Sequence, residues 1–106
     1  MNDAAGLLPR LAAALQELAD AGQTQTYGTL ARKLNCRMGD LTAALETLME
    51  ADAAADRPLR AVLCDARLTP GQPAPGFFTK AAGLGFDIPD PAAFTARHRA
   101  TLFAQP

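Results

Sequence analysis

Leucines recur every three or four residues near the start of the chain, at Leu7, Leu8, Leu11, Leu15 and Leu18. This spacing puts them on one face of an amphipathic helix, which we expect from about Leu8 to Ala21. Pro9 fits such a helix in its first turn, where a backbone N–H has no helical partner. Gly22 then provides the left-handed residue that ends the helix.

Two more helices are expected in the first half of the chain. The hydroxyl of Thr26 can cap a second helix, which Asn35 can end in a left-handed conformation. Its apolar side chains have helical spacing: Tyr27, Leu30, Ala31 and Leu34. Asp40 can cap a third helix that runs to about Ala55. The inward face of that helix contains Leu41, Ala44, Leu45, Leu48 and Met49.

The pattern changes after Pro58. Apolar side chains alternate from Leu59 to Arg67, which predicts a strand. The segment 69–76 is too rich in proline and glycine for a central strand and is expected to form a loop or an edge segment. A short helix can follow over 77–83. A last helix should start at Asp90 and Pro91, with Phe94, His98 and Leu102 on one face.

This order of elements is that of a winged helix-turn-helix. We therefore expect a mainly α fold with a small β-hairpin: three N-terminal helices, a hairpin wing and an extra C-terminal helix. Residues 1–106 should form a single domain, because two separately cored units in a chain of 106 residues would each bury too little apolar surface.

The start of the second helix resembles a known DNA-binding motif. The residues Thr26-Tyr27-Gly28-Thr29-Leu30-Ala31, followed by Leu34, are similar to the "TYG-x-[IL]-A" start of the helix-turn-helix in the C-terminal domain of DNA alkyltransferases and alkyltransferase-like proteins. The resemblance implies that Tyr27 and the following helix lie against DNA, and that a reactive cysteine follows a later strand.

Cys64 ends the predicted strand, but its neighbours differ from the proline-cysteine-histidine-arginine motif of that family. No histidine follows it, and the carboxylate of Asp65 would disfavour a thiolate. We therefore expect Cys64 to be a semi-buried strand residue rather than a nucleophile.

A second resemblance covers residues from about Tyr27 to Phe103. A family of small uncharacterised bacterial proteins shares the pattern "P-L-x-x-A-L-V … P-G-x-G-F-F-x-x-A-x-x-L-G" after a "Y-G-x-L-A" helix. The matching residues here are 57–63, 75–78, Ala81 and Leu84-Gly85, with Ala74 and Pro75 inserted in the loop. This resemblance implies a winged-helix-like fold and no particular activity.

The residues give little support to catalysis or metal binding. Cys36 and Cys64, with a single histidine, make a poor metal site, and both are expected to be reduced. His98 lies between two arginines, without a neighbouring carboxylate to orient it as a base. The glycines of 71–76 lack the lysine of a phosphate-binding loop. We expect a non-enzymatic protein with no cofactor and no metal.

No stretch approaches the roughly 20 apolar residues that span a bilayer, and the N-terminus lacks the pattern of a secretory signal. A cytoplasmic location, with no membrane partner, is therefore expected.

Nucleic acid is the first candidate partner, because the expected fold often places its third helix in the major groove. Residues 1–56 are acidic overall and residues 57–106 are basic, so a polyanion should prefer the second half. The carboxylates of Asp40, Glu46 and Glu50 disfavour insertion of the third helix. Weak, salt-dependent binding should instead use Tyr27, Arg32, Lys33, Arg37, Arg60 and Arg67.

The alternative is a protein-interaction or homodimerisation module that binds no nucleic acid. Phe77 and Phe78 are its candidate interface, since two adjacent residues cannot both face inward. Two copies could also associate through Leu15 and Leu18 of the first helix, if the leucine stripe were wider than the surface that the core of one copy buries.

Overall fold

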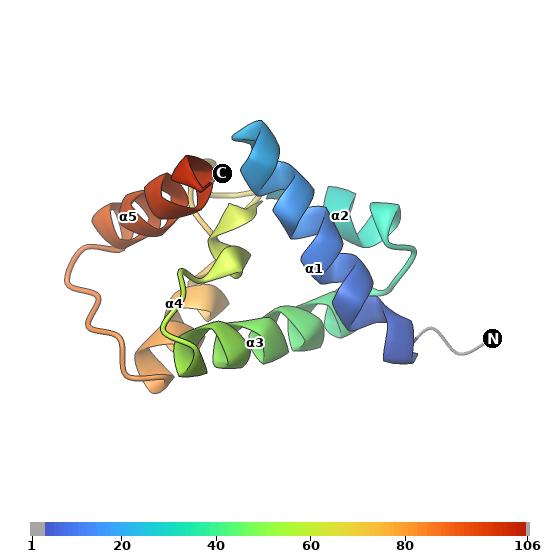
Figure 1. Cartoon of the computed structure of the whole chain (residues 1–106), viewed down its shortest axis with the longest axis horizontal. Helices are drawn as coiled ribbons and strands as arrows, with labels where there is room; N and C mark the ends of the chain where they lie inside the picture. Colours follow the sequence, from blue (N-terminus) through green and yellow to red (C-terminus); the bar gives the residue numbers. More distant parts are fainter. Residues whose placement is uncertain (1–3, 106) are drawn as a thin grey trace.

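The computed structural model describes residues 4–105 and is mainly helical, as expected. The helices are α1 (Ala4–Ala21), α2 (Tyr27–Lys33), α3 (Met38–Ala54), α4 (Pro75–Gly83) and α5 (Pro91–Ala104). A 3-10 helix, η1 (Arg60–Leu63), lies in the middle of the molecule and contacts α1, α3 and α5 (Figure 1). Within the described residues no helix is both long and apolar enough to cross a membrane.

Several helix ends agree with the sequence-based expectation. Thr26 caps α2, because its Oγ1 accepts a hydrogen bond of 3.2 Å from the backbone N–H of Thr29. Asp90 caps α5 in the same way, with its Oδ1 3.2 Å from the N–H of Ala93. Gly22 and Asn35 end α1 and α2 in the left-handed region, with φ of 66° and 53°. The local signals for these turns are therefore confirmed.

Two helix starts differ from expectation. α1 begins at Ala4, so Pro9 lies inside the helix rather than in its first turn. The additional turn lets Leu7 join the buried core. α3 begins at Met38, so Asp40 is not its cap but lies in its first turn, 3.6 Å from the guanidinium of Arg37. A carboxylate there is favoured by the positive end of the helix dipole.

The strand predicted from Leu59 to Arg67 is wrong over most of its length. Only Cys64 and Asp65 form a strand, and the four residues before them form η1. The apolar alternation does not separate an inner from an outer face here, since the side chains of 61–64 are all buried. A segment that crosses the centre of the core has no solvent-facing side, and the period of two therefore had no structural meaning.

Side chains satisfy the backbone of this central segment in place of a neighbouring strand. The N–H of Leu59 donates to Nδ1 of His98 at 2.9 Å, and the N–H of Arg60 donates to Oδ2 of Asp52 at 3.0 Å. Nε of Arg99 donates to the carbonyl of Val62 at 2.8 Å. Burial and the charge of Arg97 lower the pKa of His98, which favours the neutral imidazole that accepts this bond.

The small sheet pairs segments that are far apart in the sequence. Strand β1 (Gln25–Thr26) lies parallel to β2 (Cys64–Asp65), with Gln25 opposite Cys64 and Thr26 opposite Asp65. This corrects the expected hairpin, whose two strands would be antiparallel neighbours along the chain. The pairing fastens the start of α2 to the end of the central segment.

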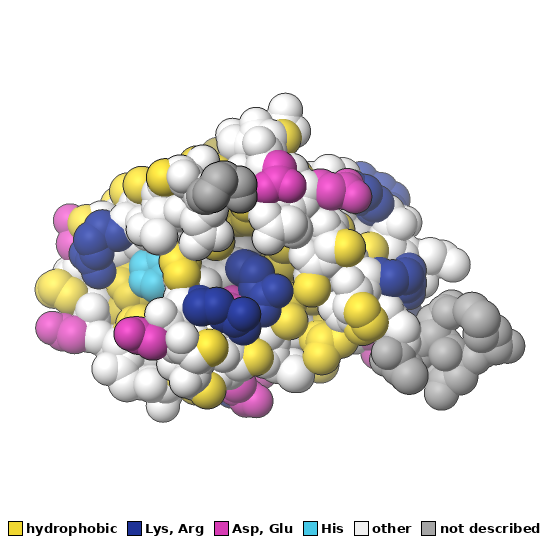
Figure 2. Space-filling view, in the orientation of Figure 1, with side chains coloured by type: hydrophobic (Ala, Val, Ile, Leu, Met, Phe, Trp, Pro, Cys, Tyr) yellow, Lys and Arg dark blue, Asp and Glu magenta, His cyan; other side chains and the backbone are white. Residues whose placement is uncertain are grey.

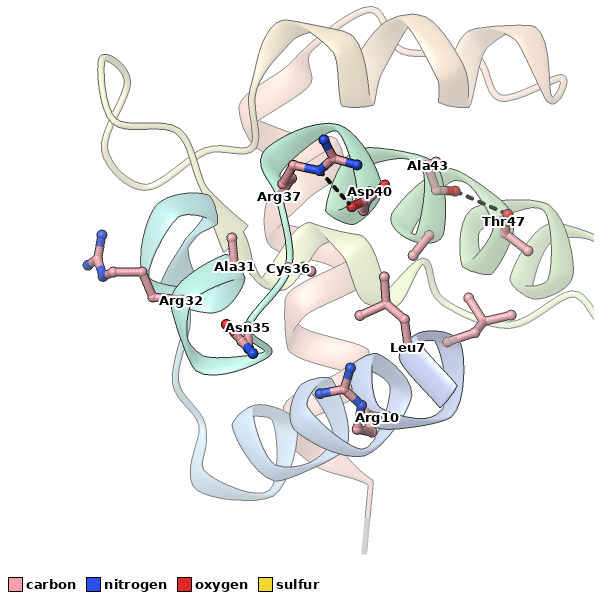
Figure 3. Close-up of a pocket in the computed structure, with 12 residues that line it drawn as sticks. Leu7, Arg10, Ala31, Arg32, Asn35, Cys36, Arg37, Asp40, Ala43 and Thr47 are labelled. Atoms are coloured by element: carbon pink, nitrogen blue, oxygen red, sulfur yellow. Dashed lines mark hydrogen bonds and ion pairs between the residues drawn. The ribbon is translucent and has the colours of Figure 1, made fainter. Parts of the chain in front are cut away.

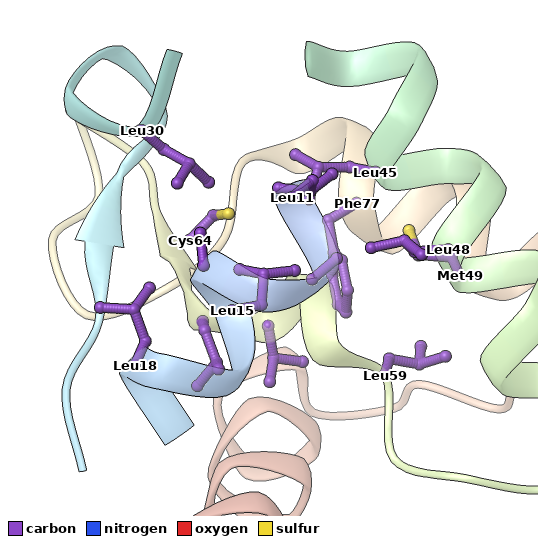
Figure 4. Close-up of a cluster of buried hydrophobic side chains, with 14 of the residues drawn as sticks. Leu11, Leu15, Leu18, Leu30, Leu45, Leu48, Met49, Leu59, Cys64 and Phe77 are labelled. Carbon is purple, nitrogen blue, oxygen red and sulfur yellow. The ribbon is translucent and has the colours of Figure 1, made fainter. Parts of the chain in front are cut away.

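One hydrophobic cluster joins every helix of the fold. Leu11 and Leu15 from α1 and Leu30 from α2 are fully buried, and Leu45, Met49 and Phe77 pack on the same cluster. Figure 4 shows these side chains together with Cys64 in one cluster between the helices. The predicted leucine faces of the helices are therefore the faces that form the core.

Candidate functional site

Three arginines from different parts of the fold surround one surface hollow of about 910 Å³. It lies between the start of α1, the end of α2 and the first half of α3 (Figure 3). Its apolar lining is Leu7, Leu8, Ala31, Cys36, Ala43 and Ala44, and its polar lining is Arg10, Arg32, Asn35, Arg37, Asp40 and Thr47. We call this hollow the basic groove.

Each arginine of the basic groove contacts one partner within the fold. Nη1 of Arg10 donates to the carbonyl of Leu34 at 3.0 Å, and Nη2 of Arg32 donates to Oγ1 of Thr29 at 3.2 Å. Arg37 has the weaker contact to Asp40 described above. A guanidinium carries five N–H donors, so each arginine retains donors for a ligand. Arg10 and Arg37 lie on opposite sides of the groove in Figure 3, and Arg32 extends outward at its edge.

Sequence reasoning singled out Arg32 and Arg37 but missed Arg10. Arg10 lies on the first helix, 24 residues before the carbonyl that orients it. Nothing in the local pattern of α1 indicates that its first turns meet the turn between α2 and α3, and no sequence signal therefore pointed to Arg10.

Lys33 and Tyr27 lie apart from the basic groove. Lys33 is 3.6 Å from the carboxylate of Glu17 on the surface. Tyr27 is partly buried, and its hydroxyl accepts a 3.0 Å hydrogen bond from the N–H of Ala74. Burial raises the pKa of Tyr27 to about 12. The tyrosine therefore fastens the loop before α4 to the start of α2.

Arg60 is occupied by an internal ion pair. Its guanidinium donates to both carboxylate oxygens of Asp52, at 2.8–3.1 Å, and Asp52 is fully buried. Arg57 approaches the same carboxylate at 3.4 Å. Arg67, by contrast, is exposed on the loop after β2. Of Arg60 and Arg67, only Arg67 is therefore an exposed residue.

Ion pairs within the fold neutralise part of the basic charge that the second half of the chain carries. Arg57, Arg60, Lys80 and Arg99 each contact a carboxylate. Figure 2 shows dark blue side chains scattered over this face: at the left beside the histidine, in the middle, and at the right. The basic groove draws its arginines from the first half instead.

The aromatic pair is divided between the core and its edge. Phe77 is 6% exposed, and Phe78 is half-buried with its ring edge-on to Phe77 at 5.1 Å between centroids. Phe78 therefore has the larger exposed surface of the two.

Cys64 lacks the surroundings of a nucleophile. The thiol is fully buried. Burial is the main cause that raises the pKa of Cys64 to about 12, and the nearby charge of Asp65 is a second cause. At neutral pH such a group is a thiol, which does not attack an alkyl or acyl carbon.

A thiol reagent at about pH 8 is therefore expected to modify one of the two cysteines of the native protein quickly. The reactive one is Cys36, which is half-buried in the lining of the basic groove. Mass spectrometry after timed labelling checks this. A Cys36→Ser variant should react only in denaturant, and rapid native labelling of that variant would contradict the assignment of Cys64 as inert.

Among the residues that the structure describes, no three or more histidine, cysteine, aspartate or glutamate side chains are grouped as a metal site would require. Comparisons of the chain with protein families, with curated proteins and with solved structures find no match.

Proposed function

We propose that this protein binds nucleic acid through phosphate contacts at the basic groove, and that it acts by binding rather than by catalysis. In this proposal α2, the turn at 34–37 and α3 serve as a helix-turn-helix, and the loop carrying Arg67 takes the place of a wing. The observation that carries it is that Arg10, Arg32 and Arg37, from three segments of the chain, all line one hollow.

The character of the groove favours phosphate over base recognition. Among the described residues that line it, Asp40 is the one carboxylate and is opposed by three guanidinium groups, so this lining has a net positive charge. Guanidinium groups bind phosphate with paired N–H donors. Further along α3, Glu46 and Glu50 would repel phosphates beside a helix that lay in the major groove. We therefore expect binding that depends little on base sequence.

Salt dependence is the direct test. Three phosphate contacts on duplex DNA correspond to a slope of about −2.7 in log affinity against log salt, which is about a 40-fold loss between about 50 and 200 mM. Fluorescence anisotropy with a labelled duplex of about 20 base pairs measures it. Each of Arg10→Gln, Arg32→Gln and Arg37→Gln should reduce the slope by about 0.9. Glutamine removes the charge and keeps an amide with two N–H donors on a shorter side chain.

Arg97→Gln is the matched control. Arg97 is an exposed arginine of α5, positioned over the ring of Phe94 at 5.6 Å and outside the lining of the groove. Its replacement should leave the slope unchanged. Equal effects of all four variants would show that net charge alone matters, and no binding to duplex DNA or single-stranded RNA at about 50 mM salt would overturn the proposal.

In that event the interaction-module hypothesis becomes the leading one. The mass of the protein in solution, measured by light scattering, then distinguishes a homodimer from a monomer that needs a different protein partner.

A further inference from the structure

A second hollow, of about 360 Å³, lies on α3 beside a different set of residues from those of the basic groove. It is bounded by the start of α2, the first half of α3 and the start of α4. The residues that define it are Tyr27, Met38, Leu45, Glu46, Met49 and Phe77. We call it the apolar groove. Thr42 lines this groove while its neighbour Ala43 lines the basic groove, so α3 separates the two.

The size and lining of the apolar groove are those of a small-molecule site. Binding pockets for small ligands usually enclose about 300–1,000 Å³ and are mostly apolar, with a few polar groups that orient the ligand. Two aromatic rings and two methionine side chains line this one. Met38 is 47% exposed, which is unusual for a large apolar side chain in this fold. A flexible thioether at that position can adapt to a flat apolar ligand.

The charge of the groove lining indicates which polar group such a ligand would carry. Of the described residues that line the apolar groove, Glu46 is the one with a charged side chain, and it is half-buried. Lys80 lines a neighbouring hollow together with Glu46, but its ammonium is 2.6 Å from the carboxylate of Glu50. The surroundings of Glu46 therefore have an excess of negative charge. The rings of Tyr27 and Phe77 add an aromatic surface, which also attracts cations.

We propose that the apolar groove binds a small aromatic or aliphatic amine, with its apolar part against Met38, Met49 and the two rings and its ammonium group at Glu46. Binding here is independent of the phosphate contacts proposed for the other side of α3. An anion of the same size would meet the carboxylate with like charge, and a neutral analogue would gain only the apolar contacts.

A matched set of probes tests this assignment: 2-phenylethylamine, 2-phenylethanol and phenylacetate. They share an apolar part and differ in charge. NMR of protein labelled in its methionine methyl groups reports occupancy directly, because Met38 and Met49 both line the groove. The amine should shift both signals saturably, with an affinity about threefold to tenfold above that of the alcohol, and phenylacetate should bind most weakly.

Two substitutions locate the site. Glu46→Gln should abolish the preference for the amine over the alcohol while leaving the alcohol's affinity unchanged. Thr42→Trp should block the groove to all three probes, and Ala43→Trp, on the other side of the helix, should leave binding intact. Both tryptophans replace exposed residues, so the fold should persist, which circular dichroism checks.

Three results would overturn the proposal: no saturable shift of the methionine signals with the amine, equal affinity for amine and phenylacetate, or undiminished amine binding by folded Thr42→Trp protein. Loss of nucleic-acid binding in the arginine variants would bear on the basic groove alone.

Discussion

Replacing Asp52 with alanine is expected to lower the free energy of unfolding by about 3–5 kcal/mol. The carboxylate is fully buried and accepts hydrogen bonds from the guanidinium and the backbone N–H of Arg60. Its removal leaves a guanidinium that is 22% exposed without its main anion, and an N–H without its acceptor. Because the stability of a small domain is only about 5–15 kcal/mol, a loss of this size is large.

Urea denaturation followed by circular dichroism measures this change. Glu17→Ala is a suitable control, since it also removes a helix carboxylate, but one that is 72% exposed and only loosely paired with Lys33. That control should cost about 0.5 kcal/mol or less. A loss below about 1 kcal/mol for Asp52→Ala would show that the buried ion pair does not hold the central segment in place.

Replacing Arg99 with methionine is expected to cost about 2–4 kcal/mol. Its guanidinium, on α5, donates to the carbonyls of Val62 and Gly71 and to the carboxylate of Asp65, at 2.8, 3.0 and 2.8 Å. One side chain thus joins the last helix to η1, to β2 and to the loop that follows. Methionine keeps most of the apolar stem and removes all three bonds, leaving the carbonyl of Val62 and the carboxylate of Asp65 to be resolvated.

Arg99→Lys should rescue little of this loss, because an ammonium group lacks the planar fork that reaches three acceptors. The same denaturation measurement compares both variants with Arg97→Met, two residues away and exposed, which should change stability by about 1 kcal/mol or less. Hydrogen exchange adds a local readout: the amide of Ala66, bonded to the carbonyl of Gln72 at 2.7 Å, should lose protection in Arg99→Met. Full protection there would argue against a bridging role for Arg99.

The basic groove illustrates what local patterns can and cannot indicate about a site. Arg32 and Arg37 were predicted because they flank the turn between two helices whose spacing is clear in the sequence. Arg10 required the packing of α1 against that turn. Arg60 was predicted to contact nucleic acid from a strand, but it lies in η1 and its guanidinium binds Asp52. Side-chain direction follows backbone conformation, so an error in the element misplaced the residue.

Leucine spacing and capping side chains by themselves determined the helices, their buried faces and most of their ends. These are local properties, set within a few residues along the chain. Tertiary structure alone decided the path from Leu59 to Asp65. There the partners of the backbone come from Asp52 on α3 and from His98 and Arg99 on α5. A buried polar backbone must find hydrogen bonds, and bonds to residues up to 39 positions away cannot be inferred from the spacing of apolar side chains.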